Sequence, residues 1–282
     1  MVQTITSMDG PIMVHLRRIR EALPRALSCI GDTYFYAQTF SLEARERMRA
    51  CADDYRASKE EDPGMEQVVA FRFLDSYWFL EDPHGSLTQA LVASRRAIEL
   101  SPTFAHGHVL RSMVLAASGE VEQAFRVAER ALELNPYDEV TAFNLASRLL
   151  QLGQIAKARD LLEAIHNDNL APPIWITTHL GVAYLLMNDL KALSRLLPQL
   201  RGSTMPLANV MLVIAESRSA DASLGQQALA QLKAHYPFLT LKYASRVYLG
   251  AHFRNPDIAK VVTEAFENAL AELQRPPADA RN

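Results

Sequence analysis

The histidines, cysteines and carboxylates of this sequence are the groups that could bind a metal ion or take part in catalysis. Their spacing argues against most such sites. His106 and His108 form a His-x-His pair, which suggests metal binding. Residues two apart on a helix point about 200° from one another, however, so one ion cannot easily take both. The polar run from His166 to Asn169 lacks the glycine and the bidentate glutamate of a calcium loop, so we expect a turn there. We therefore predict no metal and no cofactor.

Sequence patterns of common enzyme classes are also missing. The chain has no glycine-rich loop that would cradle a phosphate, no H-E-x-x-H zinc helix and no G-x-S-x-G nucleophile turn. Cys51 has no histidine nearby in the sequence that could activate its thiol. We predict that the protein is not an enzyme.

Composition limits the partners and the compartment. The 282 residues are 49% hydrophobic with a net charge of −3, which favours a folded protein without the basic excess of a nucleic-acid binder. No secretion signal is visible in residues 1–10, and no stretch approaches the roughly 18 apolar residues of a membrane span. The two cysteines, Cys29 and Cys51, suit a reducing compartment but leave one disulfide possible. We therefore expect a cytoplasmic protein.

The elements that would position any site follow a clear internal repeat. Residues 97–102 (AIELSP) return as residues 131–136 (ALELNP), an interval of 34 residues (131 − 97). Glycine and alanine recur at the same spacing, at Gly85, Gly119 and Gly153 and at Ala90, Ala124 and Ala158. These residues resemble the tetratricopeptide repeat, a pair of antiparallel helices with this period. The resemblance implies an all-α, right-handed superhelical solenoid that holds other molecules.

The repeat pattern divides the chain into four predicted segments. Residues 1–65 carry no repeat and would be a helical segment or cap, with a helix from Ser41 to Lys59 and a polar loop over residues 58–65. Residues 66–202 hold the repeats, and residues 203–274 hold degenerate helical repeats that end in atypical helices. We expect the tail, residues 275–282, to be disordered.

The family resemblance also implies where a partner would bind. In this family the concave groove is lined by fixed positions of the first helix of each pair. Transferred to this sequence, the best-matched positions and their neighbour Asn144 are His106, Val109, Met113, Val140, Phe143, Asn144, Ser147 and Gln151. Arg72, Asp75 and Phe79 follow less directly from the preceding pair. Such a largely apolar groove suits a helical or extended apolar segment, or is covered by the terminal helices of the chain itself.

Two kinds of function remain open, and a third is excluded. Val109 and Met113 occupy places where relatives that clamp acidic chaperone tails carry lysine and asparagine, so we reject that clamp. The first kind is a protein-interaction scaffold for a protein or peptide partner. The alternative is a regulatory or sensing module of a bacterial transcription or signalling regulator, which acts by forming a homo-oligomer or by binding a small ligand. Residues 253–257 (FRNPD), followed by an amphipathic stretch, resemble the end of such arrays in bacterial winged-helix and adenylate-cyclase-like regulators. The apolar groove favours the scaffold.

Overall fold

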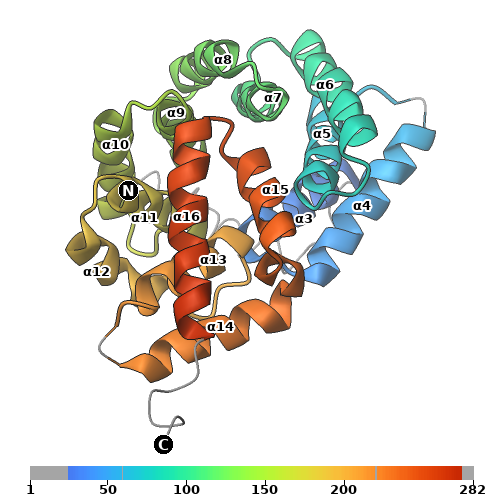
Figure 1. The fold of residues 1–282 in the computed structure, drawn as a ribbon. Coiled ribbons are helices and arrows are strands. Elements are labelled where there is room, and N and C mark those ends of the chain that lie inside the picture. Colours follow the sequence, from blue (N-terminus) through green and yellow to red (C-terminus); the bar gives the residue numbers. More distant parts are fainter. Residues whose placement is uncertain (1–24, 59, 220, 275–282) are drawn as a thin grey trace, which may run out of the picture. The chain divides into compact units, whose positions relative to one another are not determined.

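The computed structural model describes residues 25–58, 60–219 and 221–274, and in these residues every regular element is a helix (Figure 1). The predicted all-α fold is therefore confirmed. The tail 275–282 and the part of the N-terminal segment before residue 25 lie outside the described residues. Among the described residues, no helix is both long enough and apolar enough to cross a membrane.

The helices fall into two compact units. Unit 1 ends at Pro173 and unit 2 begins at Ile174. Unit 1 contains α3 (Arg25–Thr39), α4 (Leu42–Ala57), α5 (Pro63–Trp78), α6 (Pro83–Leu100), α7 (Ala105–Ser118), α8 (Val121–Leu134), α9 (Glu139–Gln151) and α10 (Ile155–Asn167). Unit 2 contains α11 (Ile174–Leu186), α12 (Leu190–Leu200), α13 (Pro206–Glu216), α14 (Ala222–His235), the short 3₁₀ helix η2 (Pro237–Thr240), α15 (Lys242–His252) and α16 (Pro256–Leu273). The sequence-based boundary between residues 202 and 203 falls inside unit 2.

The described residues of unit 1 form a stack of four helix pairs, α3–α4 to α9–α10. The first helix of each pair packs against its own partner and against the first helix of the next pair. Ala90, Ala124 and Ala158 are 0% exposed, so their small side chains let the paired helices approach closely. Gly119 and Gly153 follow α7 and α9 with φ of 95° and 75°, values that glycine adopts at little cost. The predicted stacking of helix pairs is thus confirmed.

The pair α5–α6 departs from the expected register. Its first helix begins at Pro63, within the predicted loop 58–65, because Asp62 caps it by accepting the Met65 N–H at 2.8 Å and proline fits the first helical position. Gly85 lies inside α6 and does not end a helix as Gly119 and Gly153 do. Leu80 and Asp82 instead take positive φ in the turn between α5 and α6.

The two cysteines form a disulfide between α3 and α4. Cys29 lies on α3 and is buried, and Cys51 lies on α4. The sequence had left this bond open. Because the expected reducing compartment rested partly on unpaired cysteines, the compartment stays a prediction.

Candidate partner-binding site

The predicted groove residues lie on two neighbouring helices of unit 1. His106, Val109 and Met113 belong to α7, and the other five belong to α9, which packs against α7. Four of the eight are buried: Val109, Asn144, Ser147 and Gln151. The other four are partly exposed: His106, Met113, Val140 and Phe143. The structure therefore brings all eight onto two packed helices, and we call this set of residues the α7–α9 face.

A polar cluster at one end of the α7–α9 face joins it to α3 and α5. Nε2 of His106 lies 2.9 Å from Oδ2 of Asp138, and the same Oδ2 accepts the Thr141 N–H that opens α9. On its other side, Nδ1 of His106 is hydrogen-bonded to the hydroxyl of Tyr34 on α3. Gln67 of α5 donates to that hydroxyl from 3.4 Å. His106 is thus held by the chain itself.

Asp138 sets the direction of these hydrogen bonds in the neutral imidazole of His106, because a carboxylate oxygen can only accept and Nε2 must then carry the proton. Burial raises the pKa of Tyr34 well above its usual value, so its hydroxyl carries a proton at neutral pH. The hydroxyl then donates to Nδ1 of His106, and the N–H at Nε2 donates to Asp138. His106 and His108 also contact different groups, since His108 donates to the main-chain oxygen of Pro102 at 2.8 Å. In the described part of the chain, no group of three or more potential metal ligands comes together.

Asn144 is the most unusual residue on the α7–α9 face. It is 1% exposed, and among the described residues neither its amide nitrogen Nδ2 nor its oxygen Oδ1 has a hydrogen-bond partner. Buried polar groups in proteins are nearly always hydrogen-bonded, because losing water without a replacement costs free energy. Asn144 therefore offers one unmet donor group and one unmet acceptor at the centre of the predicted site.

Arg148 lies one turn further along α9 and was not predicted. It is 6% exposed, and it donates from Nη1 to the main-chain oxygen of Ser112 and from Nη2 to Oγ of Ser147, each at 3.0 Å. Burial lowers its pKa to about 9. The bond to Ser112 braces α9 against α7, and it occupies the hydroxyl of Ser147, which the sequence had assigned to a partner.

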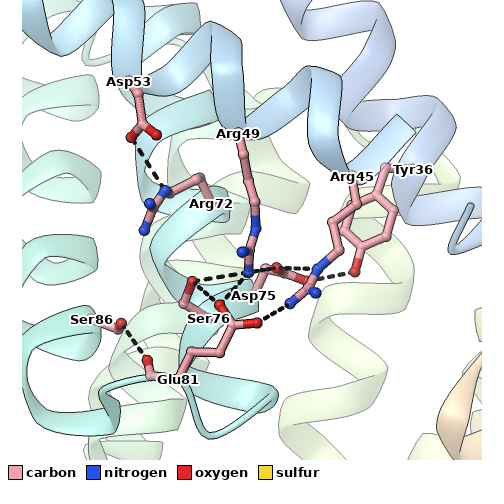
Figure 2. A network of polar contacts seen from close by, with 9 residues as sticks. All are labelled: Tyr36, Arg45, Arg49, Asp53, Arg72, Asp75, Ser76, Glu81 and Ser86. Atoms are coloured by element: carbon pink, nitrogen blue, oxygen red, sulfur yellow. Dashed lines mark hydrogen bonds and ion pairs between the residues drawn. The ribbon is translucent and has the colours of Figure 1, made fainter. Parts of the chain in front are cut away.

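Arg72 and Asp75, two of the less direct groove positions, lie on α5 and contact residues of α4 (Figure 2), and Phe79 directly follows α5. Asp75 is 1% exposed and accepts from Tyr36 at 2.5 Å, from Nε of Arg45 at 2.8 Å and from Nη2 of Arg49 at 3.1 Å. The guanidinium of Arg45 also lies 4.2 Å from the ring centre of Phe79. These positions are occupied by contacts that hold α4 on α5.

The same network binds Glu81, in the turn before α6. Its carboxylate accepts from Nη2 of Arg49 at 2.5 Å and from Nη2 of Arg45 at 3.1 Å. Burial alone would raise the pKa of Glu81, but the two guanidinium groups outweigh it, so the pKa lies below its usual value. Nε of Arg72 forms a further ion pair with Asp53, at 3.4 Å. We therefore confine the candidate site to α7 and α9.

Sequence reasoning missed Tyr34, Gln67 and Arg148, for different reasons. Tyr34 meets His106 across 72 residues, Gln67 meets Tyr34 across 33 residues, and no repeat position marks either of them. Arginine is rarely buried, so a sequence gives no reason to place Arg148 inside. Asp138 carried a usable signal, because an aspartate directly before a helix is a common N-cap.

Comparison with known proteins identifies the repeats. The family model described as Tetratricopeptide repeat matches residues 115–177, from the second half of α7 to the start of α11. This segment includes all of α9 and hence most of the α7–α9 face. No curated protein matches the chain. With the stacked helix pairs of unit 1, the match identifies tetratricopeptide repeats in residues 115–177 of this chain.

Proposed function

We propose that the protein is a non-enzymatic scaffold that captures a segment of a partner protein on the α7–α9 face. Tetratricopeptide repeats generally mediate protein–protein interactions, and the family match covers α9. The proposal that this chain is a regulatory module, drawn from residues 253–257, has no further observation in its favour.

The observation that carries the proposal is the unpartnered amide of Asn144. A buried polar group without a partner costs roughly 1–3 kcal/mol, and no described residue gives the amide of Asn144 a hydrogen bond. The main chain of a bound segment has both an N–H and a C=O, which match Oδ1 and Nδ2 of Asn144. A bound segment that supplies this N–H and C=O would form hydrogen bonds that the side chains covering Asn144 in the free chain do not form, and these bonds would favour binding.

The residues beside Asn144 suit the side chains of such a segment. Val140 lies one turn before Asn144 on α9, and Phe143 directly precedes Asn144. Both side chains are partly exposed. Apolar side chains of the partner would cover them, because removing apolar surface from water is favourable. We therefore expect a partner segment that is apolar on the side facing α9.

The titratable groups beside this face support binding and not catalysis. His106 and Asp138 resemble a base with its orienting carboxylate, but the group they contact is Tyr34. Burial raises the pKa of Tyr34, which is the wrong direction for a nucleophile. The three groups instead fix α3 to α7 and to the start of α9.

A pull-down with the tagged full-length chain tests the proposal. Phe143→Glu places a charge on the α7–α9 face and should abolish capture of a partner that the wild type retains. The control is Val92→Glu on α6, where the side chain is 63% exposed and a charge should be tolerated. If the Phe143→Glu chain, with its helical circular dichroism unchanged, still retains the partner, the α7–α9 face is not the site. Retention of an untagged copy of the chain alone would identify the partner as a second copy.

A further inference from the structure

We propose that the Cys29–Cys51 disulfide is a reversible lock on α3, that a dithiol reductant opens it, and that the state of the lock sets access to Nδ1 of His106. The proposal concerns the attachment of α3 and does not depend on the function proposed for the α7–α9 face. The argument rests on the sparse apolar burial of α3, on the contacts that α3 makes and on the unequal exposure of the two cysteines.

The helix α3 buries little apolar surface. Cys29 and Tyr36 are its buried hydrophobic residues, while Leu27 is 53% exposed. On the neighbouring helix α5, by contrast, large apolar side chains such as Phe73 and Leu74 are buried. Burial of apolar surface is the main favourable contribution to folding. The helix α3 therefore depends on its cross-links more than α5 does.

The disulfide lies between two ion pairs that also join α3 to α4. Arg25 pairs with Asp54 at 2.7 Å, and Asp32 pairs with Nε of Arg47 at 2.9 Å. The side chains of Arg25 and Asp54 are 63% and 68% exposed, so solvent screens the first pair. Without the disulfide, α3 is held on α4 by a few apolar side chains and by the ion pair of Asp32.

A contact of α3 with the start of α7 gives the lock its effect. The Tyr34 hydroxyl donates to Nδ1 of His106, and the N–H at Nε2 donates to Asp138. Nδ1 is therefore the nitrogen with a lone pair that could react, and Tyr34 covers it. A local opening of α3 withdraws Tyr34 from Nδ1. Reduction raises the population of this opening, because the bridge no longer restricts the open state.

The two sulfur atoms differ in their access to a reductant. Cys29 is 1% exposed, whereas Cys51 is partly exposed. A thiolate of the dithiol therefore attacks Sγ of Cys51, the S–S bond breaks, and Cys29 leaves as a thiolate and takes up a proton. The second thiolate of the reductant then attacks the mixed disulfide and releases the Cys51 thiolate, which takes up the second proton. Two electrons pass to the protein, and the reductant leaves as a disulfide.

The remaining contacts let α3 close again after reduction. Tyr36 donates to Asp75 of α5 at 2.5 Å, and Asp32 keeps its ion pair with Arg47. Neither contact contains a cysteine, so both survive the reduction and return the two thiols to one another. An oxidant that is itself a disulfide then re-forms the bridge by the reverse exchange. The lock is therefore reversible.

Acylation of His106 by diethyl pyrocarbonate, followed by mass spectrometry of its peptide, tests the lock in the full-length chain. The reagent needs an unprotonated nitrogen, so the rate at His106 follows the opening of α3. We expect the chain reduced with dithiothreitol, then freed of it under nitrogen, to react at least about tenfold faster at His106 than the oxidised chain. His84, an exposed residue of α6, should react equally in both.

Two variants separate the lock from the cover. Cys51→Ser removes the bridge and leaves the Cys29 thiol in place, so it should react at His106 as fast as the reduced chain without any reductant. Tyr34→Ala removes the cover and leaves the bridge, so it should react fast while oxidised and gain little from reduction. Circular dichroism checks that both variants keep their helices.

Three results would overturn the proposal. Equal rates at His106 in the oxidised and reduced chains would show that the disulfide does not govern α3. An equal acceleration at His108, which is buried on α7 and bonded to the main chain of Pro102, would show general unfolding and not a local opening. Glutathione, used as a monothiol probe, could also be found on Cys29 and not on Cys51, and the buried sulfur would then be the one attacked.

Discussion

Replacing Asn144 by leucine should stabilise the free chain and weaken partner capture. The side chain is 1% exposed, and its Nδ2 and Oδ1 have no hydrogen-bond partners. Leucine is of similar size, so it fills the space without an unmet donor or acceptor. A substitution that improves stability and removes binding is the mark of a polar group kept for a ligand.

The magnitude follows from the desolvation of the amide. Leaving a buried polar group unsatisfied costs about 1–3 kcal/mol, and leucine is also a better helix former than asparagine by a few tenths of a kcal/mol. We therefore expect the free energy of unfolding to rise by about 1–3 kcal/mol in Asn144→Leu. The same variant should lose the partner in the pull-down, because the main chain of the segment loses its hydrogen bonds.

Asn209 of α13 provides a matched control, because the same substitution there should change the free energy of unfolding in the opposite direction. It is 0% exposed, and its Nδ2 donates to the main-chain oxygens of Ser203 at 2.9 Å and Met205 at 2.8 Å. Its Oδ1 accepts from Nε2 of Gln231 at 2.8 Å. Asn209→Leu removes these three bonds and should lower the free energy of unfolding by about 1–3 kcal/mol or more.

Urea denaturation followed by circular dichroism measures both variants. The reasoning requires the midpoint to rise for Asn144→Leu and to fall for Asn209→Leu. A fall of 1 kcal/mol or more in Asn144→Leu would refute it, because Asn144 would then make a structural hydrogen bond. Unchanged partner capture by Asn144→Leu would separately refute the role of the amide in binding.

Three further predictions concern stability. Changing both Cys29 and Cys51 to serine should lower the free energy of unfolding by about 3 kcal/mol, given the 22-residue separation of the bridge, and an unchanged urea midpoint would argue against the bond. In the folded protein the pKa of Glu81 lies below its usual value. Its ion pairs therefore stabilise the fold fully above about pH 4.5, and this stabilisation is lost as the pH falls through the lowered pKa. Glu81→Gln should flatten this part of a plot of the free energy of unfolding against pH. Ala131→Arg, at a 0% exposed site in α8, should cost about 1–3 kcal/mol by overpacking, and an unaltered melting curve would contradict the repeat register.

The helices and their pairing could be read from the sequence because both depend on residues close together in the chain. Ser41 caps α4 by accepting the Ala44 N–H, as its position predicted. The 34-residue recurrence of alanine marked Ala124 and Ala158, where two helices meet. Gly119 and Gly153 marked the ends of α7 and α9, since left-handed backbone favours glycine. Each of these features is decided within one helix or one pair.

The contents of the candidate site depended on the tertiary structure. The sequence placed eight residues on the α7–α9 face, but it could not show that Tyr34 already holds His106 or that Arg148 already holds Ser147. It could not show which amide on that face lacks a hydrogen-bond partner. Whether the amide of Asn144 finds a partner depends on every group that packs around it.

The sequence by itself determined that this protein is a stack of helix pairs, since the apolar period, the caps and the small residues are local signals. Only the tertiary structure decided that Cys29 meets Cys51 and that α16 lies across α11 and α13. The reason is physical. Which side chains of two packed helices meet depends on the position and angle at which the helices pack. Contacts from many residues set that packing together, so no short stretch of sequence contains it.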